Sequence, residues 1–108
     1  MIDLAELAAA HCRPGAPALD AAESARLVAL LPGWVLEGGR VVRTFRFDDY
    51  YRTLAFVNAV AFVAHGEDHH PDLDVRWGTC AVAFSTHDAG GLTLNDFICA
   101  ARVSALYA

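Results

Sequence analysis

The chain has 108 residues, a formal net charge of −5 and no lysine, so we expect a single domain, residues 1–108, that does not bind nucleic acid. Proteins that grip phosphate backbones normally carry a basic patch, and the same argument weighs against anionic membrane surfaces. The apolar share is 56%, which is above the usual ~45–50%. Part of that apolar surface is therefore expected to lie between subunits.

Three features of the sequence predict a cytoplasmic protein with no membrane partner. The acidic N-terminal residues 1–6 lack the positive region and long apolar stretch of a signal peptide. The most apolar run, residues 54–64, is about half the length of a membrane span. Cys12, Cys80 and Cys99 are odd in number and form no C-x-x-C spacing, which is typical of buried or free thiols in a reducing compartment.

The N-terminal half of the chain predicts a helix followed by a hairpin. After a short optional helix and a loop, residues 21–31 carry leucines at near-helical spacing, and Asp20 is a suitable N-cap. Residues 34–37 and 40–47 are β-prone, and Gly38–Gly39 lies between them. Because glycine accepts the positive φ of tight turns, this pattern indicates two paired strands.

The C-terminal half predicts the same order again. The pair Asp48–Asp49 can cap a helix over residues 50–67, which is apolar nearly all round and so needs cover on more than one side. Residues 75–77 and 79–86 predict a second hairpin, and residues 94–106 a final helix. The order α-ββα-ββα indicates an α+β fold, a two-layer sandwich of one four-stranded antiparallel sheet with helices on one face.

Four of the five histidines fall between residues 65 and 87. His69 and His70 precede Pro71 at the end of the long helix, and His87 follows the predicted fourth strand. A rigid scaffold presents polar groups to ligands at the ends of its elements, and histidine exchanges protons near neutral pH. The pattern therefore favours an acid–base site at this end of the sheet.

Two other interpretations remain open from the residues alone. Each histidine, taken singly, could be a solvated helix end or an ordinary turn residue. His65 and His69, at i and i+4, could place two ligands for zinc or iron on one helical face, with His87 or Asp72 completing the set. Against a metal site, Gly66 weakens the helix and no His-Glu-x-x-His or cysteine ligand set is present.

Several segments together resemble the pterin-4a-carbinolamine dehydratases. The segments that carry the resemblance are EDHHPDL at 67–73, THDAGGLT at 86–93 and NDF at 95–97. Upstream, the likeness extends to Gly33-Trp34, the hairpin at 36–40 and the strand around Phe45-Arg-Phe47. It covers about residues 22–106, and the double histidine with proline, followed by Thr-His and a Gly-Leu-Thr turn, is a specific combination.

The resemblance implies the fold described above, assembled as a homodimer or homotetramer. It also implies a reaction, in which 4a-hydroxytetrahydropterin loses water to give a quinonoid dihydropterin. That product is then reduced and reused by an aromatic amino acid hydroxylase. The implied partner is a small-molecule pterin substrate, and no cofactor or metal is implied.

The resemblance also implies which residues form the site. The family histidines fall on His69, His70 and His87, and the family aspartate falls on Asp96. The residues implied to line or support the substrate pocket are Pro71, Trp34 and Thr86.

These residue types suit the chemistry. Loss of the 4a hydroxyl needs a proton for the departing oxygen, while a ring nitrogen must lose one, and two imidazoles can supply both transfers. We expect His69 and His87 to transfer protons and His70 to bind or orient the pterin. Asp96 could hold an imidazole in the useful tautomer or contact the pterin. It also lies three residues after Thr93, so it could cap the last helix, and one side chain could serve both purposes.

The chain departs from the family at one position. Many members have a glutamate four residues before the first paired histidine, where this chain has His65, and Glu67 would point elsewhere on a helix. The rival hypothesis is a dehydratase-like scaffold that has lost catalysis and acts as a binding or assembly factor. Such a scaffold should have broken the histidine set, whereas this chain keeps all three, which favours the enzyme.

Overall fold

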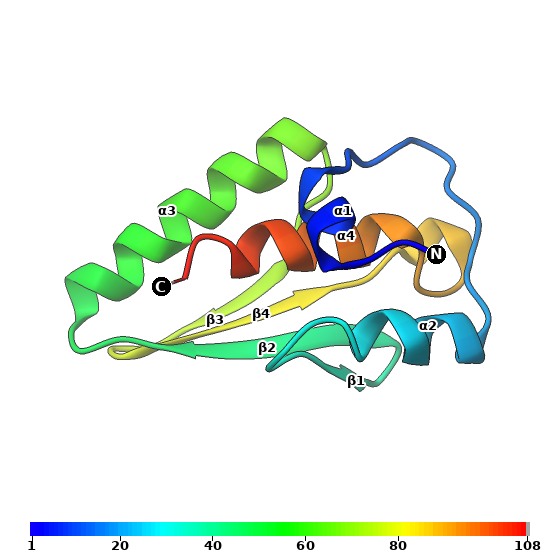
Figure 1. Ribbon diagram of the computed structural model, residues 1–108. Helices are drawn as coiled ribbons and strands as arrows, with labels where there is room; N and C mark the ends of the chain where they lie inside the picture. The colour runs from blue at the N-terminus through cyan, green and yellow to red at the C-terminus, as the bar shows by residue number, and fades with distance from the viewer. Residues whose placement is uncertain (108) are drawn as a thin grey trace.

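The computed structural model describes residues 1–107 and consists of an antiparallel sheet with helices covering one face (Figure 1). The helices are α1 (Leu4–Ala9), α2 (Ala21–Val28), α3 (Tyr50–Glu67) and α4 (Leu94–Ser104), with a 3-10 turn η1 (His87–Ala89). The strands are β1 (Val35–Glu37), β2 (Arg40–Arg46), β3 (Asp72–Val75) and β4 (Thr79–Phe84). All neighbouring strands pair antiparallel in the order β1-β2-β4-β3. The predicted α+β sandwich is confirmed.

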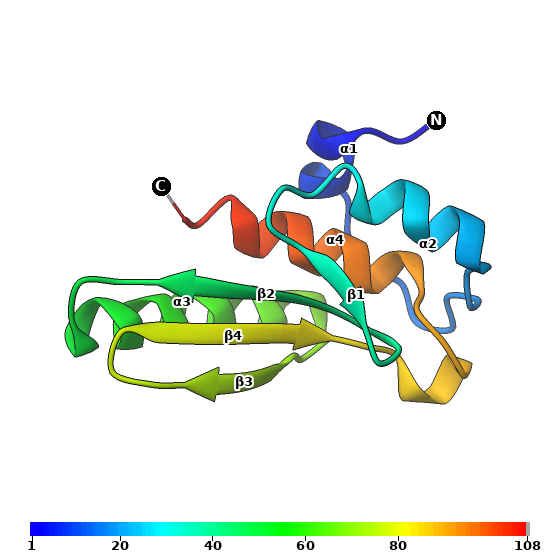
Figure 2. The same cartoon turned by 90° about the horizontal axis from the view of Figure 1, so that it is seen from below.

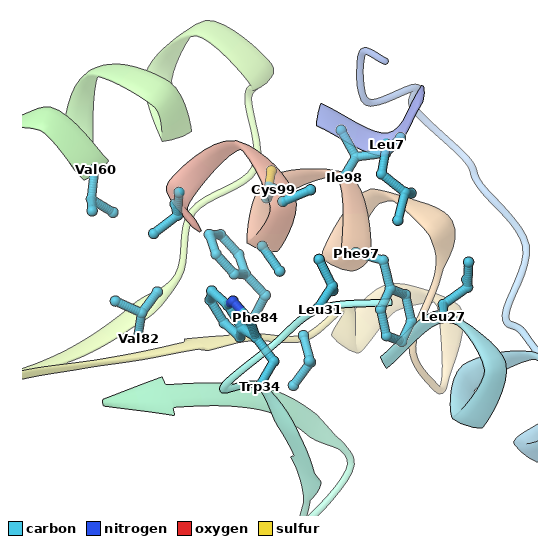
Figure 3. Close-up of a cluster of buried hydrophobic side chains, with 14 of the residues drawn as sticks. Leu7, Leu27, Leu31, Trp34, Val60, Val82, Phe84, Phe97, Ile98 and Cys99 are labelled. Atoms are coloured by element: carbon cyan, nitrogen blue, oxygen red, sulfur yellow. The ribbon is translucent and has the colours of Figure 1, made fainter. Parts of the chain in front are cut away.

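The period-two pattern of the central strands β2 and β4 makes the core, because alternate side chains point to one face. The residues that face the helices are at most 1% exposed: Val41, Phe45, Cys80, Val82 and Phe84. Seen from below, the sheet lies in front of α3 (Figure 2). Figure 3 shows side chains of α4, among them Phe97 and Cys99, in the same buried cluster as Phe84.

The predicted helix starts are confirmed at α2 and α3. Asp20 and Asp49 each accept a hydrogen bond from the backbone N–H three residues on, at 2.8 and 2.7 Å, which satisfies a free amide of the first turn. The predicted C-terminal ends of α2 and α4 lie too far along the chain. Helix α2 ends at Val28 rather than residue 31, because the amides of Leu30 and Leu31 bond carbonyls only three residues back. Helix α4 ends at Ser104 rather than residue 106.

The two predicted hairpins differ in accuracy. The first has the expected turn, with positive φ of 59° at Gly38 and 76° at Gly39. In the second, the prediction for β3 was wrong by several residues, since residues 76–78 form the turn rather than the strand. The reason is that the Arg76 amide bonds back to the Thr79 carbonyl, at 2.8 Å, which closes the turn around an exposed Trp77.

Helix α3 buries one stripe against the sheet and leaves the opposite side open. The buried stripe consists of Thr53, Phe56, Val60 and Ala64. On the open side, Tyr51 is 81% exposed and Phe62 is 71% exposed. These aromatic side chains are the surface that a second subunit would cover, and the oligomer stays a prediction. Among residues 1–107, no helix is long and apolar enough to cross a membrane.

Candidate active site

A pocket of about 290 Å³ lies where β3 begins and β4 ends. Because the two strands are antiparallel, with Asp72 opposite Ala83, the residues before β3 and after β4 meet at the same edge of the sheet. The pocket is lined by His69 and His70 from the first segment and by His87 from the second. The structure thus brings the three predicted histidines together, although they come from separate parts of the chain.

The chain turns sharply between α3 and His69. Asp68, which ends the helix, has a φ of 51°, and it is the one non-glycine residue among residues 1–107 with a positive φ. The His69 amide then donates to the Ala64 carbonyl at 3.1 Å, which is a common way to close a helix end. This turn directs the His69 side chain toward the start of α4.

There the imidazole of His69 meets a buried carboxylate. Its Nε2 lies 2.6 Å from Oδ1 of Asp96, whose side chain is fully buried, while the His69 side chain is 14% exposed. With Asp96 ionised, its oxygens only accept hydrogen bonds, so the His69 ring donates to it through Nε2. The lone pair of the neutral ring is consequently on Nδ1, which is the atom left free to accept a proton.

The second oxygen of Asp96 caps α4. Oδ2 accepts hydrogen bonds from the Thr93 amide at 2.9 Å and from the Thr86 hydroxyl at 2.7 Å. The Thr93 hydroxyl lies 3.1 Å from that of Thr86, which completes the network. One carboxylate therefore caps the helix and holds the His69 imidazole at the same time. Because the Thr86 hydroxyl is engaged with Asp96, the structure gives this residue a supporting contact as well as a place in the pocket wall.

Trp34 lies behind the site rather than in it. The His69 ring stacks on Phe84, with ring centroids 5.9 Å apart and planes 12° apart. Phe84 in turn packs against Trp34, with ring centroids 6.2 Å apart, and Figure 3 shows these two side chains together. The indole is 5% exposed, and its Nε1 donates to the Ser104 hydroxyl at 2.7 Å. Trp34 lines none of the three pockets that include His69, so its contact with the site runs through Phe84. Its predicted role in substrate binding stays a prediction.

Pro71 lines an adjoining pocket of about 380 Å³ together with His65, His69 and His70. His65 itself is exposed on the surface of α3. Because the helix ends at Glu67, His65 and His69 do not share a helical face, and the geometry behind the metal interpretation is lost. Within residues 1–107, no group of three or more His, Cys, Asp or Glu side chains is arranged to hold a metal ion.

A second wall of the site comes from the N-terminus and was not predicted. A pocket of about 560 Å³ shares His69 and Thr86 with the pocket that holds the three histidines, and its other side is formed largely by residues 11–16. We call residues 10–16 the N-terminal strap. In Figure 1 the blue N-terminal segment passes the C-terminal end of α3 and the start of α4.

The strap is tied down by two buried polar side chains. Glu67 accepts a hydrogen bond from the Cys12 amide at 2.7 Å and lies 2.9 Å from Nδ1 of His11. Asn95 grips the backbone of Arg13, accepting from its amide at 3.0 Å and donating to its carbonyl at 2.8 Å. Burial raises the pKa of Glu67, but the Cys12 amide, His11 and the Arg102 guanidinium outweigh it, so the pKa lies below its ordinary value.

Sequence reasoning missed the strap because its anchors are far away along the chain. The Glu67 contacts span 55 and 56 residues and the Asn95 contacts span 82. The local signals, a polar loop with prolines and glycine, indicate only irregular structure. The sequence marks neither Glu67 nor Asn95 as an anchor, because the burial that requires them to have partners exists only in the folded chain.

Comparison with known proteins shows which family this chain belongs to. The family model described as pterin 4 alpha carbinolamine dehydratase matches residues 17–106. The chain belongs to the pterin-4a-carbinolamine dehydratase family. A Xylella fastidiosa (strain 9a5c) protein provisionally named pterin-4-alpha-carbinolamine dehydratase is 58% identical, covering 99% of this chain and 97% of its own length. A Stenotrophomonas maltophilia (strain K279a) protein with the same provisional name is 57% identical, covering 98% and 96%.

Solved structures agree with this membership in the pterin-4a-carbinolamine dehydratase family. A transcriptional coactivator/pterin dehydratase from Brucella melitensis is similar with a TM-score of 0.79 and 27% identity, covering 84% of this chain and 99% of that one. A pterin dehydratase-like protein identified as a RuBisCO assembly factor in the alpha-carboxysome gives 0.60 and 25%, covering 68% and 88%. The strap precedes the stretch that the family model matches, yet the Xylella relative aligns over nearly the whole chain.

Proposed function

We propose that this protein catalyses the dehydration of 4a-hydroxytetrahydropterin to quinonoid dihydropterin and water. The observation that carries the proposal is one pocket that collects His69, His70 and His87, with the first of them oriented by a buried aspartate. Membership in the pterin-4a-carbinolamine dehydratase family supports the substrate class. Recycling of the product for an aromatic amino acid hydroxylase, in the cytoplasm, is the role we propose for the reaction.

In this mechanism His69 is the base. The free Nδ1 of its ring takes the proton from the ring nitrogen next to the 4a carbon, and the negative charge of Asp96 stabilises the imidazolium that forms. His87, protonated, gives its proton to the 4a oxygen as the carbon–oxygen bond breaks. A carbon–nitrogen double bond forms, water leaves, and solvent returns the two histidines to their starting states.

The remaining residues position the substrate. His70 is exposed at the pocket and has the reach to hold the pterin ring, while Pro71 shapes the neighbouring wall. The reaction removes water without any change in oxidation state, so histidine acid–base catalysis accounts for it and no cofactor is required.

The test is an absorbance assay on freshly generated 4a-hydroxytetrahydropterin. We expect the wild-type protein to accelerate formation of the quinonoid product well above the spontaneous rate, and His69→Ala and His87→Ala to remove most of that acceleration. Circular dichroism of each variant checks that the fold is retained. A folded wild-type protein that leaves the spontaneous rate unchanged would contradict the proposal.

The second candidate is a catalytically silent binding or assembly factor. It is favoured by the similarity to the pterin dehydratase-like protein that is identified as a RuBisCO assembly factor. The three histidines and the buried aspartate in this chain favour the enzyme instead, because an assembly factor has no need of a proton-accepting ring held at a pocket. The same assay separates the two, since a silent scaffold would fold but give no rate.

A further inference from the structure

Two cysteines meet where the strap crosses α4. Sγ of Cys12 lies 3.4 Å from Sγ of Cys99. Cys99 is fully buried in the middle of α4, whereas Cys12 is partly exposed and lines the large pocket beside His69. The dehydration mechanism uses neither sulfur, so the contact needs another explanation.

The strap holds Cys12 in this place from both sides. The Cys12 amide donates to Glu67, and the backbone N–H and C=O of the next residue, Arg13, are both hydrogen-bonded to the Asn95 side chain. Asn95 and Cys99 lie one turn apart on α4 and therefore share a face of that helix. These backbone contacts keep the Cys12 sulfur over the Cys99 sulfur, and the Cys12 thiol also donates to the Asn95 carbonyl at 3.6 Å.

We propose that Cys12 and Cys99 are an oxidation site that closes to a reversible disulfide with a peroxide as oxidant. A disulfide needs its sulfur atoms about 2.05 Å apart, so the two must approach by about 1.4 Å. Cys99 is fixed in a packed helix, whereas Cys12 lies in irregular chain after α1, and the movement falls on the strap.

The steps balance with hydrogen peroxide alone. The Cys12 sulfur attacks one peroxide oxygen, the oxygen–oxygen bond breaks, and Cys12 becomes a sulfenic acid as one water leaves. The Cys99 sulfur then attacks the Cys12 sulfur, and its proton departs with the sulfenic oxygen as a second water. Two thiols are oxidised by two electrons, and one peroxide is reduced to two waters.

The order of the two steps follows from burial. The hydrogen bond with Cys12, and then burial, raise the pKa of the Cys99 thiol. Cys99 therefore remains a protonated thiol that solvent does not reach, and the thiol in the pocket wall reacts first. Burial also raises the pKa of Cys80, which lies on β4 inside the sheet and serves as the unreactive reference.

The bond would fasten the strap to α4. Because the strap forms one wall of the large pocket and His69 lies in the same pocket, oxidation would fix the shape of that wall. The site does not rest on the dehydratase proposal, since thiol chemistry is measured without the pterin.

The experiment treats the full folded protein with hydrogen peroxide and measures intact mass and peptides without reduction. Trypsin cleavage after Arg76 and Arg102 leaves Cys80 and Cys99 on one peptide, so the cross-link is mapped in the Cys80→Ser variant. We expect the loss of two hydrogens, a peptide joined through Cys12 and Cys99, and full return of free thiols with dithiothreitol. Cys12→Ser and Cys99→Ser should each lack the joined peptide.

A second readout is stability. The bond would close a loop spanning most of the chain, so the oxidised protein should unfold at a midpoint at least about 5 °C above the reduced one, and Cys12→Ser should show no such rise. Wild-type protein that keeps its thiols under peroxide overturns the proposal. Oxygen uptake at Cys12 without cross-linking, or a cross-link through Cys80, overturns it equally.

Discussion

His69 and His87 line the same pocket but are held in different ways. His69 is stacked on Phe84 and bound to a fully buried Asp96 that is itself fixed by two threonines. His87 is exposed at the first position of a 3-10 turn after β4. A general base such as His69 must present one defined lone pair, which requires a fixed tautomer. A general acid such as His87 can be reprotonated by solvent when it is exposed. The difference in burial thus matches the division of work we propose.

The largest effect should come from replacing either histidine with alanine. Both His69→Ala and His87→Ala should lower the dehydration rate by about 10²–10⁴-fold, the usual contribution of general acid–base catalysis. The two variants should differ in their free energy of unfolding. His69→Ala leaves a buried carboxylate oxygen without its partner and should cost about 1–3 kcal/mol of unfolding free energy in urea. His87→Ala should stay within about 0.5 kcal/mol.

A control and a double variant sharpen that comparison. His69→Gln retains a donor for Asp96 without a proton-transfer group, so it should recover stability but not activity. If the two histidines act in one step, the double alanine variant should lose less than the product of the single losses. Equal destabilisation by the two single variants would contradict the difference described above.

Next in size is the conversion of Asp96 to asparagine. The amide oxygen should stay toward the Thr93 amide and the Thr86 hydroxyl, which places the amide NH₂ against Nε2 of His69. His69 would then accept at Nε2 and carry its proton on Nδ1, which removes the free base. We expect a loss of about 10²-fold in kcat. An unchanged kcat with normal folding would show that the tautomer does not matter.

Glu67, which anchors the strap, and Glu23, which lies on the surface, offer a second comparison between a buried and an exposed side chain. Glu67→Gln replaces a buried charged acceptor and should cost about 1–2 kcal/mol of unfolding free energy. The pKa of Glu67 in the folded protein is lowered from its ordinary value of 4.5. The contribution of Glu67 to the free energy of unfolding is therefore fully present above pH 4.5 and is lost as the pH falls through the lowered pKa. Glu67→Gln should flatten that part of the stability–pH curve. Glu23→Gln, at a surface pair with Arg26, is the matched control and should change it little.

A smaller effect is expected at His70. It is exposed, and we place it in substrate orientation rather than proton transfer. His70→Ala should raise KM several-fold and lower kcat by less than about 10-fold. Steady-state kinetics measure both, and a loss in kcat as large as that of His69→Ala would assign His70 to the chemical step.

The smallest effect should be at His65. It is exposed on α3, two residues before the helix ends, and it touches neither Asp96 nor the histidine pocket. His65→Ala should leave kcat and KM within about twofold and stability within about 0.5 kcal/mol. A His65→Ala variant as impaired as His69→Ala would reopen the metal interpretation.

The sequence was sufficient for the fold where local rules apply. Caps at Asp20 and Asp49 and the Gly38–Gly39 turn are short-range features that residue chemistry determines. The position of β3 was wrong because a turn around an exposed Trp77 overrode its β propensity. The dual contact of Asp96 was foreseen as one option, since its spacing from Thr93 and the family resemblance both pointed to it. The strap was beyond reach, because nothing local predicts contacts between residues 12 and 67.

The contacts of the site also span the chain, and this has a consequence for refolding. The His69–Asp96 bond joins residues 27 apart, and the strap anchors join residues 55 and 82 apart. Contacts between distant residues form late, since chain closure must precede them. During refolding from urea, helical signal should therefore return before activity does. The time at which enzyme turnover returns would then report the last stage of folding, in which the N-terminal strap packs against the sheet and helices.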